Sequence, residues 1–556
     1  MPAFAKPFSA AITPGHLQRL YKDGVFDVPS TSLQNALLRT FINYVFPCIP
    51  VVDLEFLESI TKSRKSGEAN ISLLLYHSIM FSATSYVPME DLIRAGYSSR
   101  KEACEPFFQR AKHLYESGYE SDELIIVQAL LLLTYMSGQT EDTRDCWNWV
   151  GVTVSVALKL GLFQDHPGPE VSCIDQKLLK RVGWACFMQD CLISLTLRCR
   201  PRIQKHDFQL ECLKEEDFDL DTLITDIKAG SFEFCSAKDF VIQKDLILLC
   251  VSTAKLCVCI NMVLEIQGKN NNQTNNSALI EVISSPQYQT PSYDHIDQLL
   301  TCDKNLTNWM HSLPPACKYR ASGKADTEDS SFVVFLQRCL LHMIFYTTVS
   351  ILHQSRFMAS SANRTCDAAC QITTIAQVLH ESKLHYYLPS PGITAILVAM
   401  VIQLLESQPH PSRQPRNSAA KNLHLCIAVM SDLYEVFPDV EVAISAISSI
   451  IPKITSAPPR CLEDCDSTLT GLRLRNNGSF HSDSIGYNTP KTNLLPFGLP
   501  IEFGDNVMTD SGCNFPEYTT PLNSSLAFGN WEGIDPLFGY PTEASPGEEE
   551  LYQIYC

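Results

Sequence analysis

The sequence predicts an all-α protein, in which a multi-helix domain is followed by a disordered acidic C-terminal tail. Over most of residues 31–455, apolar side chains recur at spacings of three and four, which is the periodicity of a helix face. Alternating apolar and polar residues with turn pairs, the pattern of β-hairpins, are scarce there. Beyond residue 456 the periodicity fades, and Pro, Ser, Thr, Asn and Gly become frequent. We therefore expect a tail or linker remnant over 1–30, a helical domain over 31–455 and a tail over 456–556.

Charge and composition narrow the class of function. The 556 residues carry a net charge of −18, which argues against the whole chain attracting nucleic acid through its own field. The first residues lack the long apolar run of a signal peptide. The apolar run 124–135 is too short to span a membrane, and the longer run 247–266 contains Lys255 and several polar residues. We therefore expect no membrane span and no membrane partner. The prediction is a soluble intracellular protein.

The 22 cysteines do not have the spacing of a zinc site. Structural zinc sites usually contain pairs of cysteines with two residues between them, and no such pair occurs in this chain. The nearest pairs, Cys366/Cys370 and Cys461/Cys465, have three intervening residues. Cysteines within apolar helical runs are expected to be small buried hydrophobes. We therefore expect no cofactor held by this chain itself.

The first helix is expected over residues 31–45. Thr31 or Ser32 is a suitable N-cap, and Pro47 and Pro50 end the pattern. The apolar face of this helix consists of Leu33, Leu37, Leu38, Phe41, Ile42 and Val45.

Further helices are expected throughout the domain. Their ranges are 71–82, 100–117, 122–136, 145–160, 176–197, 237–265, 332–357, 366–380, 393–405 and 419–436. Three polar segments, 268–277, 320–331 and 408–417, are expected to be exposed loops.

The segment around residues 145–163 is explained by packing. The side chains expected on one face of its helix are Trp147, Val150, Gly151, Val154, Ala157 and Leu158. Gly161 stands where a C-cap glycine is expected, and Leu162 and Phe163 can fold back onto the last turn. No nucleophile, metal ligand or phosphate-binding loop is evident in this segment.

The next helix places two charged residues in apolar surroundings. Arg181 and Asp190 lie among residues that pack inward, and we expect each of them to pair with a neighbour. Pro201 ends the element, and Asp207 and Phe208 follow it.

Together these two helices carry a family motif. Its positions in this chain are Trp147, Leu160-Gly161-Leu162, Arg181, Trp184, Phe187, Asp190 and Arg200-Pro201. The motif resembles the fungal-specific transcription factor domain, also called the middle homology region of fungal zinc-cluster regulators. Segments 37–57 and 106–138 are similar to the cutinase transcription factor-like branch. The resemblance is specific over about residues 30–220, extends by pattern to about 455 and is absent beyond.

The chain departs from the family pattern in two ways. Gly183, Cys191 and Cys199 replace a tryptophan, an arginine and a Gly or Arg, which is expected to weaken local packing or a salt bridge. Members of the family usually begin with a six-cysteine binuclear zinc cluster that reads DNA. In this chain the first cysteine is Cys48. The resemblance therefore implies zinc only if a cluster lies upstream, and DNA contact either through that module or indirectly.

The tail has the composition of an amphipathic activation segment. Residues 492–556 contain no Lys, Arg or His, and acidic residues are interleaved with aromatic ones. Such a segment cannot readily bury enough surface to fold alone, and it presents aromatic side chains to a partner groove. The residues expected to carry activation are Phe528, Trp531, Glu532, Asp535, Phe538 and Tyr540. An inert solubilising tail is the alternative.

A helical biosynthetic enzyme is the competing class. Its strongest candidate is the acidic run 215–219, which could hold magnesium, although charge runs are usually solvated faces. Metalloprotease, P-loop, dinucleotide and nucleophile-elbow motifs are missing. The scattered histidines His16, His77, His342 and His385 are expected to be structural.

One basic cluster interrupts the acidic chain. It consists of Arg198, Arg200, Arg202, Lys205 and His206. The cluster could touch phosphate, but a surface turn paired with the acidic run 211–221 is the favoured interpretation.

The sequence as a whole predicts a nuclear transcriptional regulator rather than an enzyme. By resemblance, it activates a pathway or biosynthetic gene set and recruits the transcription machinery or a coactivator through its tail. It forms a homodimer, or a heterodimer with a zinc-cluster regulator. A co-regulator that lacks its own DNA binding and pairs with a zinc-cluster relative stays open.

Overall fold

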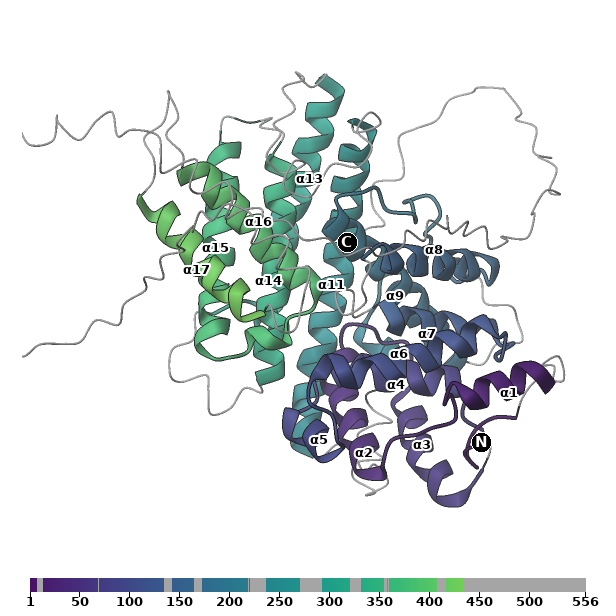
Figure 1. The fold of residues 1–556 in the computed structure, drawn as a ribbon. Coiled ribbons are helices and arrows are strands. Elements are labelled where there is room, and N and C mark those ends of the chain that lie inside the picture. The colour runs from purple at the N-terminus through teal and green to yellow at the C-terminus, as the bar shows by residue number, and fades with distance from the viewer. Residues whose placement is uncertain are drawn as a thin grey trace, which may run out of the picture. The chain divides into compact units, whose positions relative to one another are not determined.

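The computed structural model describes most of the first part of the chain (Figure 1). The described residues are 1–7, 14–68, 70–134, 143–164, 173–218, 220, 237–270, 293–320, 332–354, 358, 360–407 and 417–433. Contacts divide the chain into the units Met1–Leu462 and Glu463–Cys556, and the described residues all belong to the first. Within the described residues, β-pairing is limited to one isolated bridge between Ala5 and Ile71. The all-α prediction is confirmed there, and the predicted tail lies outside the described residues.

Helices and one π-helical turn make up the N-terminal half of the described unit. They are α1 Pro14–Lys22, α2 Thr31–Thr40, the π-helical turn η1 Phe41–Val45, α3 Leu54–Ser66, α4 Leu73–Thr84, α5 Met89–Arg94, α6 Arg100–Glu116, α7 Glu123–Thr134, α8 Thr143–Lys159 and α9 Cys173–Leu197. Helix α4 packs against α2, α6 and α7, and α7 packs against α8 and α9. All twelve residues of α4 are buried, as expected of a helix that is apolar on every side.

The remaining helices form the second half of the described unit. They are η2 Glu215–Phe218, α11 Ala237–Asn270, α13 Tyr293–Ser312, η3 Pro315–Cys317, α14 Phe332–His353, α15 Ser361–Glu381, η4 His385–Tyr387, α16 Ser390–Ser407 and α17 Asn417–Leu433. Helix α11 packs against α9 and also against α13 and α14, so it connects the two halves. Helices α14 to α17 pack in succession (Figure 1).

The first 30 residues differ from the expected tail or linker remnant. They contain α1, and their apolar side chains are part of the hydrophobic core. The buried ones are Phe4, Ala5, Leu20, Val25 and Phe26. These residues lie between prolines and glycines, so they show no helical period, although tertiary packing buries them.

The start and end of α2 also differ in detail. Ser30, not Thr31 or Ser32, is the N-cap, and its hydroxyl accepts a hydrogen bond from the Leu33 N–H at 3.3 Å. The predicted helix continues through the π-helical turn, where the Phe46 N–H donates to the Phe41 carbonyl at 2.9 Å. The apolar face predicted for residues 33–45 is buried.

Three helices have the length and composition of membrane spans, which the sequence interpretation had excluded. They are Phe240–Gln267, Phe332–His353 and Ser390–Ser407. In Phe332–His353, 83% of the most apolar window is buried inside the protein. Packing against neighbouring helices therefore accounts for the apolar character of this helix.

Candidate functional site

Arg181 is a buried arginine on α9 that joins three segments of the chain. Its Nε donates to the Pro50 carbonyl at 3.3 Å, and its Nη1 donates to the Asp217 carbonyl at 2.7 Å. Its Nη2 pairs with the Asp53 carboxylate. The side chain is 2% exposed, and a charge at such depth is tolerated only when it is paired and hydrogen-bonded. Arg181 thus holds the start of α3 and the end of η2 against α9.

Asp217 shows how the acidic run 215–219 is used. Its carboxylate lies 3.0 Å from Lys180 Nζ and accepts the Lys214 N–H at 2.8 Å. This carboxylate, the centre of the proposed magnesium motif, is therefore held by a lysine and a backbone N–H.

Trp184 and Phe187 belong to an aromatic cluster. Phe208 stacks on Phe187 with ring centroids 4.3 Å apart, and it meets Trp184 edge-on at 4.8 Å. Phe163 approaches the same ring at 5.9 Å. The indole N–H of Trp184 donates to the Glu211 carbonyl at 2.8 Å. Phe208 is central to the cluster, yet it was not among the predicted site residues.

One glycine ends α8, and another allows α9 to approach that end closely. Gly161 has φ +68°, and the Leu162 N–H donates to the Ala157 carbonyl at 3.0 Å, as predicted for a C-cap glycine. A Cβ added to Gly183 would lie 2.4 Å from the Leu162 carbonyl oxygen. The prediction that Gly183 weakens packing is therefore wrong, because its missing side chain permits this close contact.

The turn after α9 is attached to α8 by Arg202. Its guanidinium carbon lies 4.0 Å from the centroid of the Trp147 ring, and its Nη2 donates to the Trp147 carbonyl at 3.3 Å. A Cβ added to Gly151 would lie 3.0 Å from the same guanidinium carbon. Trp147 and Gly151, four residues apart on one helix face, therefore form the seat for Arg202. A side chain at Gly151 would occupy the space that the Arg202 guanidinium fills.

Asp190 fixes the same turn from α9. Its carboxylate accepts the Ile203 N–H at 2.8 Å, and Asn261 on α11 donates to the Ile203 carbonyl at 2.9 Å. Burial raises the pKa of Asp190 to about 6, although the N–H groups of Ile203 and Arg202 and the charge of Arg202 oppose the shift. Asp190 therefore pairs with the backbone of the turn.

The residues of the basic cluster have partners in their own turn and on α11. Arg200 is exposed and donates to the Gln204 amide oxygen at 2.9 Å, whereas Pro201 is buried. The Lys205 N–H donates to Glu265, and His206 lies 3.4 Å from Asp207. For these residues the structure shows partners other than the acidic run 211–221 that the sequence suggested.

A cavity of about 50 Å³ lies among α9, α11, α14 and α16. Apolar side chains line most of it, and Gln189, Thr253 and Gln337 provide polar groups. The Gln337 amide oxygen already accepts a hydrogen bond from the Cys48 thiol at 3.3 Å. This composition suits a small apolar group with one hydrogen-bonding end.

The structure thus brings together only part of the predicted set. Trp147 meets Arg202, and Trp184 meets Phe187, whereas Arg181 and Asp190 fix different segments to α9. The six predicted activation residues, Phe528 to Tyr540, lie outside the described residues.

Comparison with known proteins decides the family. Residues 38–311 match the fungal specific transcription factor domain. This part of the chain belongs to the fungal specific transcription factor domain family. It contains α8, α9 and every motif residue from Trp147 to Pro201, so the resemblance inferred from those residues is confirmed.

Several curated relatives align beyond this domain. Cutinase transcription factor 1 beta of Fusarium vanettenii is 35% identical over 82% of this chain and 53% of its own length. Cutinase transcription factor 1 alpha of the same organism is 24% identical over 78% of this chain and 44% of its own length. The acetamidase regulatory protein of Emericella nidulans is 24% identical over 70% and 43%. The chain spans about half the length of these relatives.

The family and the names of these relatives are those of transcription regulators, not of enzymes. The family match and these names therefore argue against the class of helical biosynthetic enzymes. The packed charges of α9 agree with this, since Arg181 and Asp190 hold backbone groups of neighbouring segments.

Proposed function

We propose that this chain is a nuclear transcriptional regulator that activates a pathway or biosynthetic gene set. Membership of the fungal specific transcription factor domain family carries the proposal, together with relatives named as transcription factors and regulators. In this proposal the helical domain provides regulation and self-association. The acidic segment 456–556 recruits the transcription machinery or a coactivator. The interleaved acidic and aromatic residues of 492–556 support this role.

A reporter assay tests the activator role directly. Residues 457–556 are fused to an unrelated DNA-binding domain, and transcription from a promoter with its sites is measured. We expect a clear rise, because aromatic side chains interleaved with acidic ones can bind a coactivator groove.

Two matched variants separate specific recruitment from simple charge. Replacing Phe528, Trp531, Phe538 and Tyr540 with alanine is expected to abolish most of the rise while keeping every acid. Replacing the same number of serines and threonines in 457–527 is expected to leave it unchanged. A fusion that is expressed but gives no rise would contradict the activator role and favour an inert tail.

A second candidate is a co-regulator that relies on a partner for DNA binding. It is supported by the net charge of −18, which disfavours direct attraction to nucleic acid. The test is gel retardation of promoter DNA by this chain alone and with a full-length zinc-cluster relative. Retardation only with the relative, and co-purification of the two, is the expected result for a co-regulator. Retardation by the chain alone would contradict it.

A further inference from the structure

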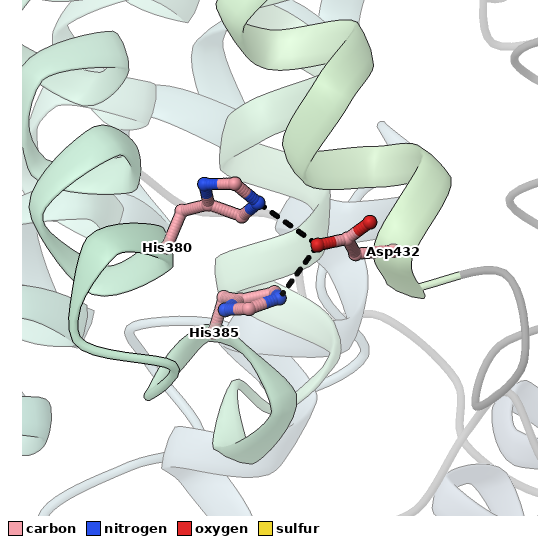
Figure 2. A group of neighbouring side chains, drawn as sticks. All are labelled: His380, His385 and Asp432. Atoms are coloured by element: carbon pink, nitrogen blue, oxygen red, sulfur yellow. Dashed lines mark hydrogen bonds and ion pairs between the residues drawn. The ribbon is translucent and has the colours of Figure 1, made fainter.

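Three side chains far apart in the sequence converge at one corner of the C-terminal helices. His380 is in the last turn of α15, His385 is in η4, and Asp432 is near the end of α17. Figure 2 shows both imidazoles facing one carboxylate oxygen of Asp432. The Nε2 atoms of His380 and His385 lie 2.9 and 3.7 Å from Asp432 Oδ2. One ligand atom from each residue falls within 4.8 Å of the other two.

A tight turn brings the second histidine back over the first. Lys383 has φ 56°, a left-handed conformation that a side chain other than glycine seldom adopts. The Leu384 N–H donates to the Leu379 carbonyl at 2.8 Å, which closes the end of α15. As a result the two imidazole rings have centroids 4.8 Å apart.

His385 is the member of the group that lacks a hydrogen bond. Its side chain is 2% exposed, and neither of its ring nitrogens makes a hydrogen bond. A buried polar group without a partner is costly, so native proteins rarely leave one. The hydrogen bond between His380 and Asp432 accounts for those two residues, whereas His385 has only the 3.7 Å approach of its Nε2 to the same carboxylate.

We propose that His380, His385 and Asp432 bind a divalent transition-metal cation of the zinc type. Zinc takes imidazole nitrogens and carboxylate oxygens at about 2.0–2.2 Å, so tetrahedral ligand atoms stand roughly 3.4 Å apart. The distances of 2.9 and 3.7 Å bracket that separation. The third separation, between the two imidazole nitrogens, is within 4.8 Å, so metal binding requires the rings to rotate toward each other.

The donor set and exposure agree with this cation. Two imidazoles favour zinc and its neighbours over calcium and magnesium, which prefer oxygen ligands. His380 and Asp432 are 34% and 47% exposed, so a water molecule can take the fourth position.

The proposed cation fastens α17 to the end of α15 and to η4. The sequence interpretation expected no cofactor in this chain and a structural role for His385. The donors follow no metal motif, because His380 and His385 are separated by a turn and Asp432 comes from another helix.

Zinc binding by the complete chain, without a histidine tag and after chelation, tests the site. Calorimetry and metal analysis after dialysis give affinity and stoichiometry for the wild type, His385→Gln, Asp432→Asn and His424→Gln. His424 is an exposed histidine of α17 and serves as the matched control. We expect the wild type and His424→Gln to bind one more zinc than the other two variants. In those two, the affinity at this site should fall at least about tenfold.

Two further measurements keep the test decisive. Because the chain has 22 cysteines, Co²⁺ is used as a probe, and a visible band without thiolate charge transfer is expected. Zinc should raise the unfolding midpoint of the wild type and of His424→Gln, but not of Asp432→Asn. The Asp432 side chain is half-exposed, so this substitution is not expected to unfold the protein. Equal stoichiometry and affinity in all four proteins, or a thiolate spectrum for the bound Co²⁺, would overturn the proposal.

Discussion

Arg181 and Asp190 show how single residues fix other segments to α9. Both are buried on α9; Arg181 reaches backbone groups that are distant in the sequence, and Asp190 reaches the turn that directly follows the helix. The sequence could indicate that each needs a partner, since charges in apolar surroundings are paired. It could not name Pro50, Asp217 or Ile203, because backbone carbonyls and N–H groups carry no sequence signal. Their selection depends on how the intervening helices pack.

Removing the partner of Arg181 is expected to cost more than removing a surface pair. Asp53→Asn leaves a buried guanidinium without its countercharge, and we expect a loss of about 3 kcal/mol in the free energy of unfolding. Urea denaturation measures it. The control Arg94→Gln removes the exposed pair with Asp91, which should contribute at most about 1 kcal/mol. Equal effects would mean that Arg181 is satisfied by carbonyls alone.

Asp190 is expected to make stability depend on pH. Its folded pKa of about 6 is above the ordinary value of 3.8, so the native state binds the proton more tightly than the unfolded chain. This contribution is present at low pH and is lost as pH rises through about 6, by about 2–3 kcal/mol in total. The groups around the carboxyl are Arg202 and the thiols of Cys186, Cys191 and Cys199.

The variant Asp190→Asn isolates this effect. An asparagine still accepts the Ile203 N–H but does not ionise. Denaturation at pH 5 and pH 7 should show the wild type losing stability relative to the variant as pH rises. A constant difference between the two proteins across this range would show that Asp190 does not titrate there.

At the scale of elements, helices with a strong apolar period were the easiest to predict. Helices α4, α6, α7, α8, α9, α11 and α14 to α17 lie where periodicity placed them, with ends that differ by a few residues. Helix α13 was missed, although Leu299, Cys302, Leu306 and Trp309 are buried along one face. Its polar residues and the neighbouring polar segment concealed that spacing. Helices α1, α3 and α5 were missed because prolines and glycines interrupt their surroundings.

The close approach of α8 and α9 gives a prediction for Gly183. In Gly183→Ala the new Cβ meets the Leu162 carbonyl oxygen, which is backbone and cannot rotate away. We expect a loss of roughly 1–3 kcal/mol in stability. The matched control is Gly15→Ala in α1, where a Cβ meets nothing within 4 Å and alanine favours the helix. Thermal unfolding of both variants checks this, and a neutral Gly183→Ala would mean that the two helices can separate at little cost.

At the scale of the whole molecule, buried cysteines recur through the core of the described residues. Cys104, Cys186, Cys250 and Cys339 are buried, and burial raises the pKa of each thiol, to about 12 for Cys104 and Cys339. A thiol with a raised pKa is a poor nucleophile and a poor metal ligand. The expectation that cysteines in apolar helical runs are small buried hydrophobes is confirmed for Cys250 and Cys257, whereas Cys259 is half-buried.

Alkylation of the native protein tests this arrangement. We expect the buried thiols to react with iodoacetamide at pH 8 far more slowly than Cys212, which is partly exposed, and all of them to react in denaturant. Peptide mass spectrometry identifies the modified residues. Modification of Cys104 or Cys339 as fast as Cys212 would show that the core opens readily.

The sequence by itself determined the helical class, most helix positions, the C-cap at Gly161 and the family motif, because periodicity, capping and motif spacing are local properties of the chain. Tertiary structure decided which distant residues meet. It placed Arg202 on Trp147 and Gly151, set α9 against the α8 terminus at Gly183, and buried the apolar residues of the first 30 positions. It also brought His380, His385 and Asp432 together from three elements. Such contacts depend on how helices pack across long connections, and that information is shared by the whole core rather than by any one segment.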